Sequence, residues 1–129
     1  MEQIALLAAA LVLSACATVP TSGPIAKSPI RTDGFVTFGQ PTRVGALVVT
    51  PQAVVEDSRC PINARCVWAG RLILKARIDG AGWRETVNMT LGEAYATHGT
   101  GLALVLAEPG KLAGSPPSPP ARLFGFEAR

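Results

Sequence analysis

The sequence predicts an all-β protein, a small single-domain β-sandwich of about seven strands. After residue 34, apolar residues either alternate with polar ones or form short β-branched runs, which is the pattern of strands. Gly and Pro separate these runs at short intervals. No stretch has the 3.6-residue period of an amphipathic helix. An immunoglobulin-like arrangement is the favoured architecture, and a small β-barrel is the alternative.

The expected domain, residues 35–129, follows two other segments. The apolar run from Ile4 to Leu13 is shorter than the about 20 residues that a membrane-spanning helix needs, and it is typical of a signal-peptide core. The next four residues, Leu13-Ser14-Ala15-Cys16, resemble the lipobox of bacterial lipoproteins. This resemblance implies that residues 1–15 are a lipoprotein signal peptide and that Cys16 becomes the lipidated N-terminus. The alternative is an ordinary secretory signal with an incidental cysteine.

Residues 16–34 are predicted as a flexible tether. Their prolines and glycine, among Thr, Ser and Lys, show no core-forming pattern. In bacterial lipoproteins an Asp directly after the lipidated cysteine often signals retention in the inner membrane, and here Ala17 follows. The resemblance therefore implies an envelope lipoprotein, anchored through its lipid to the outer membrane and facing the periplasm.

The scattered distribution of the basic residues argues against nucleic acid as a partner. Loss of residues 1–15 removes Glu2 and no basic residue, which changes the formal charge from +3 to +4. The bases are scattered, with no compact run of Lys or Arg such as nucleic-acid-binding segments carry.

The first strands are expected at 35–38, 44–50 and 53–56, separated by Gly39, Pro41 and Pro51. The clearest pattern follows at 72–78, where Leu72, Leu74, Ala76 and Ile78 share one face. Residues 79–82 are expected to form a hairpin turn, and residues 83–90 a returning strand.

The last third predicts strands at 102–106 and 123–126. Between them, residues 114–120 read Gly-Ser-Pro-Pro-Ser-Pro-Pro, and prolines favour polyproline II over a sheet. This segment is interpreted as a stiff loop between strands. The alternative interpretation is a ligand for an aromatic groove.

The cysteines predict a disulfide. If Cys16 carries lipid, Cys60 and Cys66 remain, and an oxidising periplasm favours their pairing. A structural zinc site needs about four Cys or His ligands with short spacings, and the remaining candidate, His98, is more than thirty residues away. The sequence therefore predicts no metal and no cofactor.

The residues around these cysteines carry a resemblance. Asp57-Ser58-Arg59-Cys60-Pro61, followed by Cys66-Val67-Trp68-Ala69-Gly70, resembles the signature of a group of small secreted bacterial proteins of unknown function. The resemblance implies a secreted β domain with the Cys60–Cys66 disulfide. It implies no enzymatic activity.

Catalytic patterns are absent from the sequence. A nucleophile–His–acid arrangement needs an oriented imidazole, and His98 lies in a Gly- and Thr-rich segment expected to be a loop. Glu56 and Asp57 are adjacent, so in a strand they point to opposite faces and cannot easily act as a glycosidase pair. The protein is predicted not to be an enzyme. A hydrolase or metal-dependent enzyme using His98 is the alternative.

Asp57, Arg59, Arg65 and Trp68 form the candidate interaction surface around the stapled loop. In one interpretation, Asp57 pairs with an arginine and Trp68 lies in the core over the disulfide. In the other, the arginines and Trp68 are a binding hot spot. The predicted function is a non-catalytic binding module in the periplasm, with an envelope protein as partner and residues 60–68 as contact surface.

Overall fold

The computed structural model describes residues 29–114 and 119–129. The predicted signal peptide, Cys16 and residues 17–28 of the tether lie outside the described residues, as do residues 115–118 of the proline-rich segment. Within the described part of the chain, no helix is long and apolar enough to cross a bilayer.

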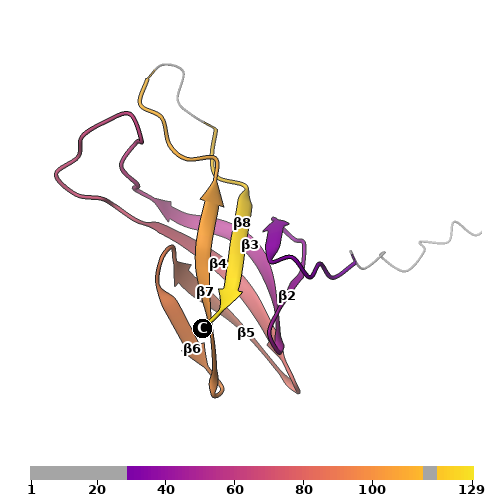
Figure 1. Ribbon diagram of the computed structural model, residues 1–129. Helices are drawn as coiled ribbons and strands as arrows, with labels where there is room; N and C mark the ends of the chain where they lie inside the picture. Colours follow the sequence, from indigo (N-terminus) through magenta and orange to yellow (C-terminus); the bar gives the residue numbers. More distant parts are fainter. Residues whose placement is uncertain (1–28, 115–118) are drawn as a thin grey trace, which may run out of the picture.

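In the described residues, eight strands form two antiparallel sheets, which confirms the β-sandwich and shows that the barrel alternative is wrong (Figure 1). The strands are β1 (Phe35–Thr37), β2 (Thr42–Val44), β3 (Leu47–Asp57), β4 (Leu72–Gly80), β5 (Trp83–Thr90), β6 (Ala94–Thr97), β7 (Thr100–Glu108) and β8 (Leu123–Ala128). One sheet has the order β1-β8-β7-β6, and the other has the order β2-β3-β4-β5.

The strands are connected as a meander. β2 to β5 pair in sequence order in one sheet, β6 to β8 do so in the other, and β1 completes the second sheet beside β8. Immunoglobulin domains instead use Greek-key connections between their sheets. The likeness to these domains is therefore confined to the two-layer architecture.

The core lies between the two sheets. The predicted inward face of β4 is confirmed, because Leu72, Leu74, Ala76 and Ile78 are all buried without exposed surface. Their burial follows from the period of two, which places alternate side chains on the same face of a strand. The partners from the other sheet are Val36, Leu102, Leu104, Ala107, Phe124 and Phe126.

The expected break at Pro51 is wrong. β3 runs through this residue without interruption, and Pro51 is buried opposite Ala76 on β4. Register shifts lie between Pro51 and Ala53 and between Val54 and Glu56. Proline is tolerated within sheets at such bulges, because the missing N–H falls where the ladder is already interrupted.

The loop expected around His98 is a hairpin. β6, which the sequence analysis missed, pairs with β7 up to Thr97 and Thr100. The two residues of the turn, His98 and Gly99, have φ angles of 48° and 73°. Two successive positive φ angles are the requirement of a type I′ turn, whose twist matches that of the flanking strands.

Residues directly before the predicted boundary at Phe35 bond to the domain. The Arg31 N–H donates to the Pro41 carbonyl at 3.0 Å, and the Arg43 N–H donates to the Arg31 carbonyl at 2.7 Å. All eight strands and the core lie within residues 35–128. A chain that starts at Ala17 therefore retains every element described here.

Candidate functional site

The β3–β4 connection, residues 58–70, projects from one end of the sandwich together with the segment that follows β7 (Figure 1). We call residues 58–70 and 109–113 the tip. The Ser58 N–H donates to the Arg71 carbonyl at 2.8 Å, and the Cys60 N–H donates to the Ala69 carbonyl at 2.9 Å. These bonds extend the β3–β4 hairpin beyond the sheet, so the base of the tip continues a rigid element.

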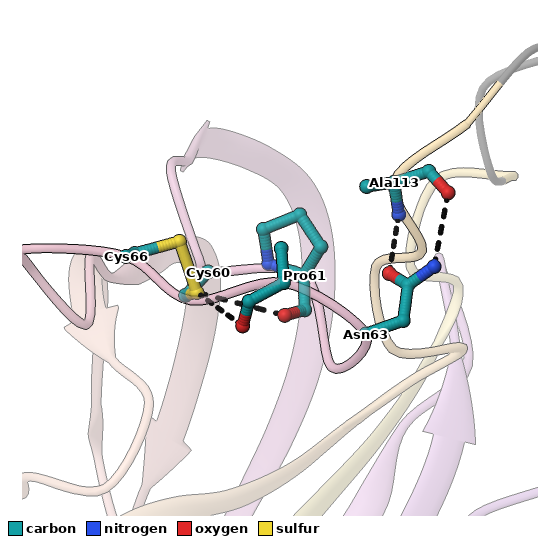
Figure 2. Close-up of a disulfide and its surroundings, with 6 residues drawn as sticks. Cys60, Pro61, Asn63, Cys66 and Ala113 are labelled. Atoms are coloured by element: carbon teal, nitrogen blue, oxygen red, sulfur yellow. Dashed lines mark hydrogen bonds between the residues drawn. A yellow bond between two sulfur atoms is a disulfide. The ribbon is translucent and has the colours of Figure 1, made fainter.

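Cys60 and Cys66 close the loop of the tip, as predicted. Their sulfur atoms lie 2.15 Å apart and their Cα atoms 5.8 Å apart (Figure 2). Closing a loop of about seven residues stabilises the fold by about 2.4 kcal/mol in the chain-entropy account. The disulfide restricts the part of the tip that lies beyond the backbone bonds of the hairpin base.

Asn63 ties the two segments of the tip together. Its side-chain amide donates to the Ala113 carbonyl at 3.0 Å, and its side-chain oxygen accepts from the Ala113 N–H at 2.7 Å (Figure 2). The Ile62 N–H also donates to the Lys111 carbonyl at 2.9 Å. Asn63 was not among the predicted site residues. Only the fold shows its role, because its partner lies fifty residues away.

Asp57 and Arg59 form the predicted local salt bridge, but they face inward. Arg59 donates two hydrogen bonds to the Asp57 carboxylate, at 2.7 and 2.9 Å, and others to the carbonyls of Ala107 and Pro109. The side chain of Arg59 is only 14% exposed, and that of Asp57 is 20% exposed. The hydrogen bonds from Arg59 lower the pKa of Asp57, against the opposing effect of burial. This pair holds the tip to the end of β7 and adds little to a contact surface.

The interpretation of Trp68 as a core residue is wrong. Its exposed fraction is 83%, and those of Val67 and Ile62 are 94% and 77%. The tip extends past the ends of both sheets, so no second layer covers these side chains. Arg65 is also exposed, as the hot-spot interpretation requires.

The charge of the tip is positive. No Asp or Glu occurs in residues 58–70 or 109–113, whereas Arg59, Arg65 and Lys111 do. Asp57 neutralises Arg59, and the Lys111 ammonium donates to the Asp57 carbonyl at 3.0 Å. Among the described residues, Arg65 has no carboxylate partner within salt-bridge distance.

His98 lies in a second cluster, at the open edge between β5 and β6. Its ring stacks on Trp83, with centroids 3.7 Å apart and planes 13° from parallel. The Nδ1 atom lies 2.8 Å from the Thr97 hydroxyl, which in turn bonds to Glu85, and the Tyr95 hydroxyl lies 3.4 Å from the same carboxylate. We call these five residues the seam cluster, because β5 and β6 belong to different sheets and do not pair.

The structure does not bring a nucleophile at the tip to His98. Ser58 bonds to Arg71, directly before β4 begins, whereas Trp83 pairs with Gly80 at the other end of β4. At about 3.3 Å per residue, the nine residues of β4 separate the two sites by roughly 30 Å. Within residues 29–114 and 119–129, no group of three or more His, Cys, Asp or Glu residues could hold a metal ion.

Comparison of the chain with family models, with curated proteins and with solved structures finds no match. The resemblance of residues 57–61 and 66–70 to small secreted bacterial proteins therefore stays a prediction.

Proposed function

We propose that the protein is a non-catalytic binding module of the bacterial cell envelope and that the tip is its contact surface. The observation that supports this proposal is the exposure of Ile62, within the loop that the disulfide closes, and of Val67 and Trp68, directly after Cys66. Single exposed apolar residues are common, but three large ones on a short projecting loop are typical of an interaction site. Trp is also enriched among the residues that contribute most to binding.

The order of the tip supports binding further. The disulfide, the Asn63–Ala113 pair and the Arg59 hydrogen bonds hold its backbone in one conformation. Binding by a mobile loop costs conformational entropy, and a pre-ordered loop loses less of it. The exposed apolar side chains are therefore presented without a large ordering cost.

In this proposal a lipid on Cys16 anchors the chain to the envelope, in the outer membrane and facing the periplasm. Each buried methylene of an acyl chain contributes about 0.8 kcal/mol, so several chains give a stable anchor. A tether of about 17 residues spans roughly 20 to 25 Å and keeps the domain near the membrane surface. Confinement near the membrane raises the effective concentration of any envelope partner.

Co-sedimentation with washed envelope membranes tests the proposal. The chain from Ala17 onward, which lacks any lipid, is expected to sediment with the membranes, and Trp68→Ala and Arg65→Gln are expected to reduce the bound fraction. Val55→Ala and Arg43→Gln are the matched controls, since both residues are exposed on strands outside the tip.

Equal binding by the tip variants and the controls would show that the contact surface lies outside the tip. Absence of binding by the native chain would contradict the binding role itself. The alternative, a hydrolase or metal-dependent enzyme using His98, would replace the proposal if a turnover were found that His98→Ala abolishes in a folded chain.

A further inference from the structure

We infer that the partner of the tip is an anionic membrane surface, into whose interfacial region Trp68, Val67 and Ile62 insert. This inference rests on the proposed function and names the class of its partner. A protein partner with an acidic surface is the competing possibility. The composition, charge and shape of the tip favour lipid.

The residue types of the tip match the chemistry of a membrane interface. Trp has an apolar ring with a polar N–H and concentrates at the level of the lipid headgroups. The branched aliphatic side chains of Ile62 and Val67 supply apolar area without any polar atom. Arg65, in the same loop, has a long apolar stem that allows its guanidinium to reach phosphate while the loop stays at the surface.

The electrostatics of the tip favour an anionic surface. Residues 58–70 and 109–113 contain no carboxylate that anionic headgroups would repel. Arg65 has no carboxylate partner among the described ion pairs, whereas Lys111 lies beside Asp57. A neutral membrane would attract the apolar side chains alone, so the inferred partner carries negative charge.

The backbone at the base of the tip is bonded internally. Four main-chain N–H groups in residues 58–70 donate to main-chain carbonyls: Ser58 to Arg71, Cys60 to Ala69, Ile62 to Lys111 and Ala64 to Pro61. Peptide groups that lose water without gaining a partner are costly to move toward a bilayer. No such donor lies in residues 65–70, so the inferred insertion is confined to side chains at the interfacial level, where water still reaches the backbone.

The shape of the tip favours lipid over protein. A stable protein–protein interface of standard size involves about 20 to 30 residues on each side and well-matched shapes. The 18 residues of the tip are two segments that project from the end of the sandwich (Figure 1). A fluid lipid surface needs no matching pocket, and a weak contact suffices where a lipid anchor already confines the domain.

Protein-free vesicles test the inference. The chain from Ala17 onward is mixed with vesicles of phosphatidylglycerol and phosphatidylethanolamine, or of phosphatidylcholine alone, and the bound fraction is measured by sedimentation. Binding is expected to the anionic vesicles and to weaken as salt is raised. Arg65→Gln is expected to weaken it about fivefold. Trp68→Ser is expected to weaken it about tenfold through the loss of inserted apolar area.

Arg43→Gln is the decisive control, because it changes the net charge by the same amount as Arg65→Gln but lies on the edge strand β2. Equal losses for the two arginine variants would show a diffuse attraction of the whole cationic domain and would overturn the inference. So would absence of binding to the anionic vesicles.

The outcomes separate this inference from the proposed function. Tip-dependent binding to native envelope membranes, without binding to protein-free vesicles, would identify an envelope protein as the partner and leave the binding role intact. Failure to bind either kind of membrane would contradict both.

Discussion

At the scale of single residues, two arginines in one loop have different roles. Arg59 and Arg65 are indistinguishable by residue type, and the sequence predicted both on the contact surface. The fold buries Arg59 against Asp57 and two carbonyls of the β7 end and leaves Arg65 exposed. The difference arises from partners about fifty residues away, which no local pattern reveals.

The different surroundings of the two arginines predict effects of different size on stability. Arg59→Ala leaves the partly buried Asp57 carboxylate without its partner, and we expect the free energy of unfolding to fall by about 2 kcal/mol. Arg65→Ala is expected to change it by less than about 0.5 kcal/mol, as is usual for an exposed residue. Urea unfolding of both variants measures this. Equal midpoints for the two would contradict the role of Arg59 as the bond between the tip and β7.

Gly70 provides a second comparison of single residues. It has a φ of +68°, and a Cβ built on it would lie 1.8 Å from the Ser58 carbonyl oxygen. Gly82 has a similar φ, +77°, but nothing lies within 4 Å of such a Cβ. Gly82→Ala should therefore cost only the backbone strain of about 1–2 kcal/mol, and Gly70→Ala should cost more because the hairpin base must also separate. Thermal unfolding of the two variants measures the difference in stability. Equal stability of Gly70→Ala and Gly82→Ala would mean that the hydrogen bond from the Ser58 N–H to the Arg71 carbonyl is not maintained in solution.

At the scale of elements, the β4–β5 hairpin was predicted well and the β5–β6 region was not. Strict alternation from Leu72 to Ile78 predicted both the strand and its buried face. β6, with the sequence Ala-Tyr-Ala-Thr, is too short for a period to appear, and its turn uses His98 in a conformation that glycine usually adopts. The sequence predicted a break at Pro51 because proline usually interrupts a strand. The bulges that allow β3 to continue are defined only by its register against β4.

The seam cluster connects β5 to β6 through Glu85, and its effect on Tyr95 can be measured. Burial, followed by the charge of Glu85, raises the pKa of Tyr95 above its ordinary value of 10.0. Because the pKa of Tyr95 is higher in the folded state than in the unfolded state, its contribution to the free energy of unfolding is fully present below pH 10. That contribution is lost as the pH rises through the folded-state pKa. In Glu85→Gln we expect the pKa of Tyr95 to fall while burial still holds it above 10.0.

The measurement is straightforward because the chain contains one tyrosine. Phenolate absorbance during alkaline titration reports Tyr95 alone, and His98→Ala serves as the control that leaves the carboxylate in place. An identical titration of the native chain and Glu85→Gln would show that Glu85 does not face Tyr95 in solution.

At the scale of the whole molecule, the proposed function makes the sandwich a scaffold and the tip its contact surface. Composition and periodicity predicted the two-layer β architecture, because burial of alternate residues requires two sheets that face each other. The surface could not be predicted to the same degree. The exposure of Trp68 depends on how far the tip extends beyond the sheets, and the sequence offers no measure of that distance.

The proposed anchor predicts a defined mature chain. Cys16 is expected at the N-terminus, acylated, after loss of residues 1–15, and the intact mass of the membrane-extracted protein measures both changes. An unmodified chain, or one cleaved at another position without added acyl mass, would contradict the anchor while leaving the domain and its tip unaffected.

The most direct test of the central claim is the fluorescence of Trp68 in a chain from Ala17 onward that carries Trp83→Phe, so that one tryptophan remains. On addition of washed envelope membranes, we expect the emission of Trp68 to shift to shorter wavelength and its quenching by aqueous iodide to decrease, because the exposed ring leaves water. A chain that sediments with the membranes while Trp68 keeps its emission and its full quenching would contradict the tip as the contact surface.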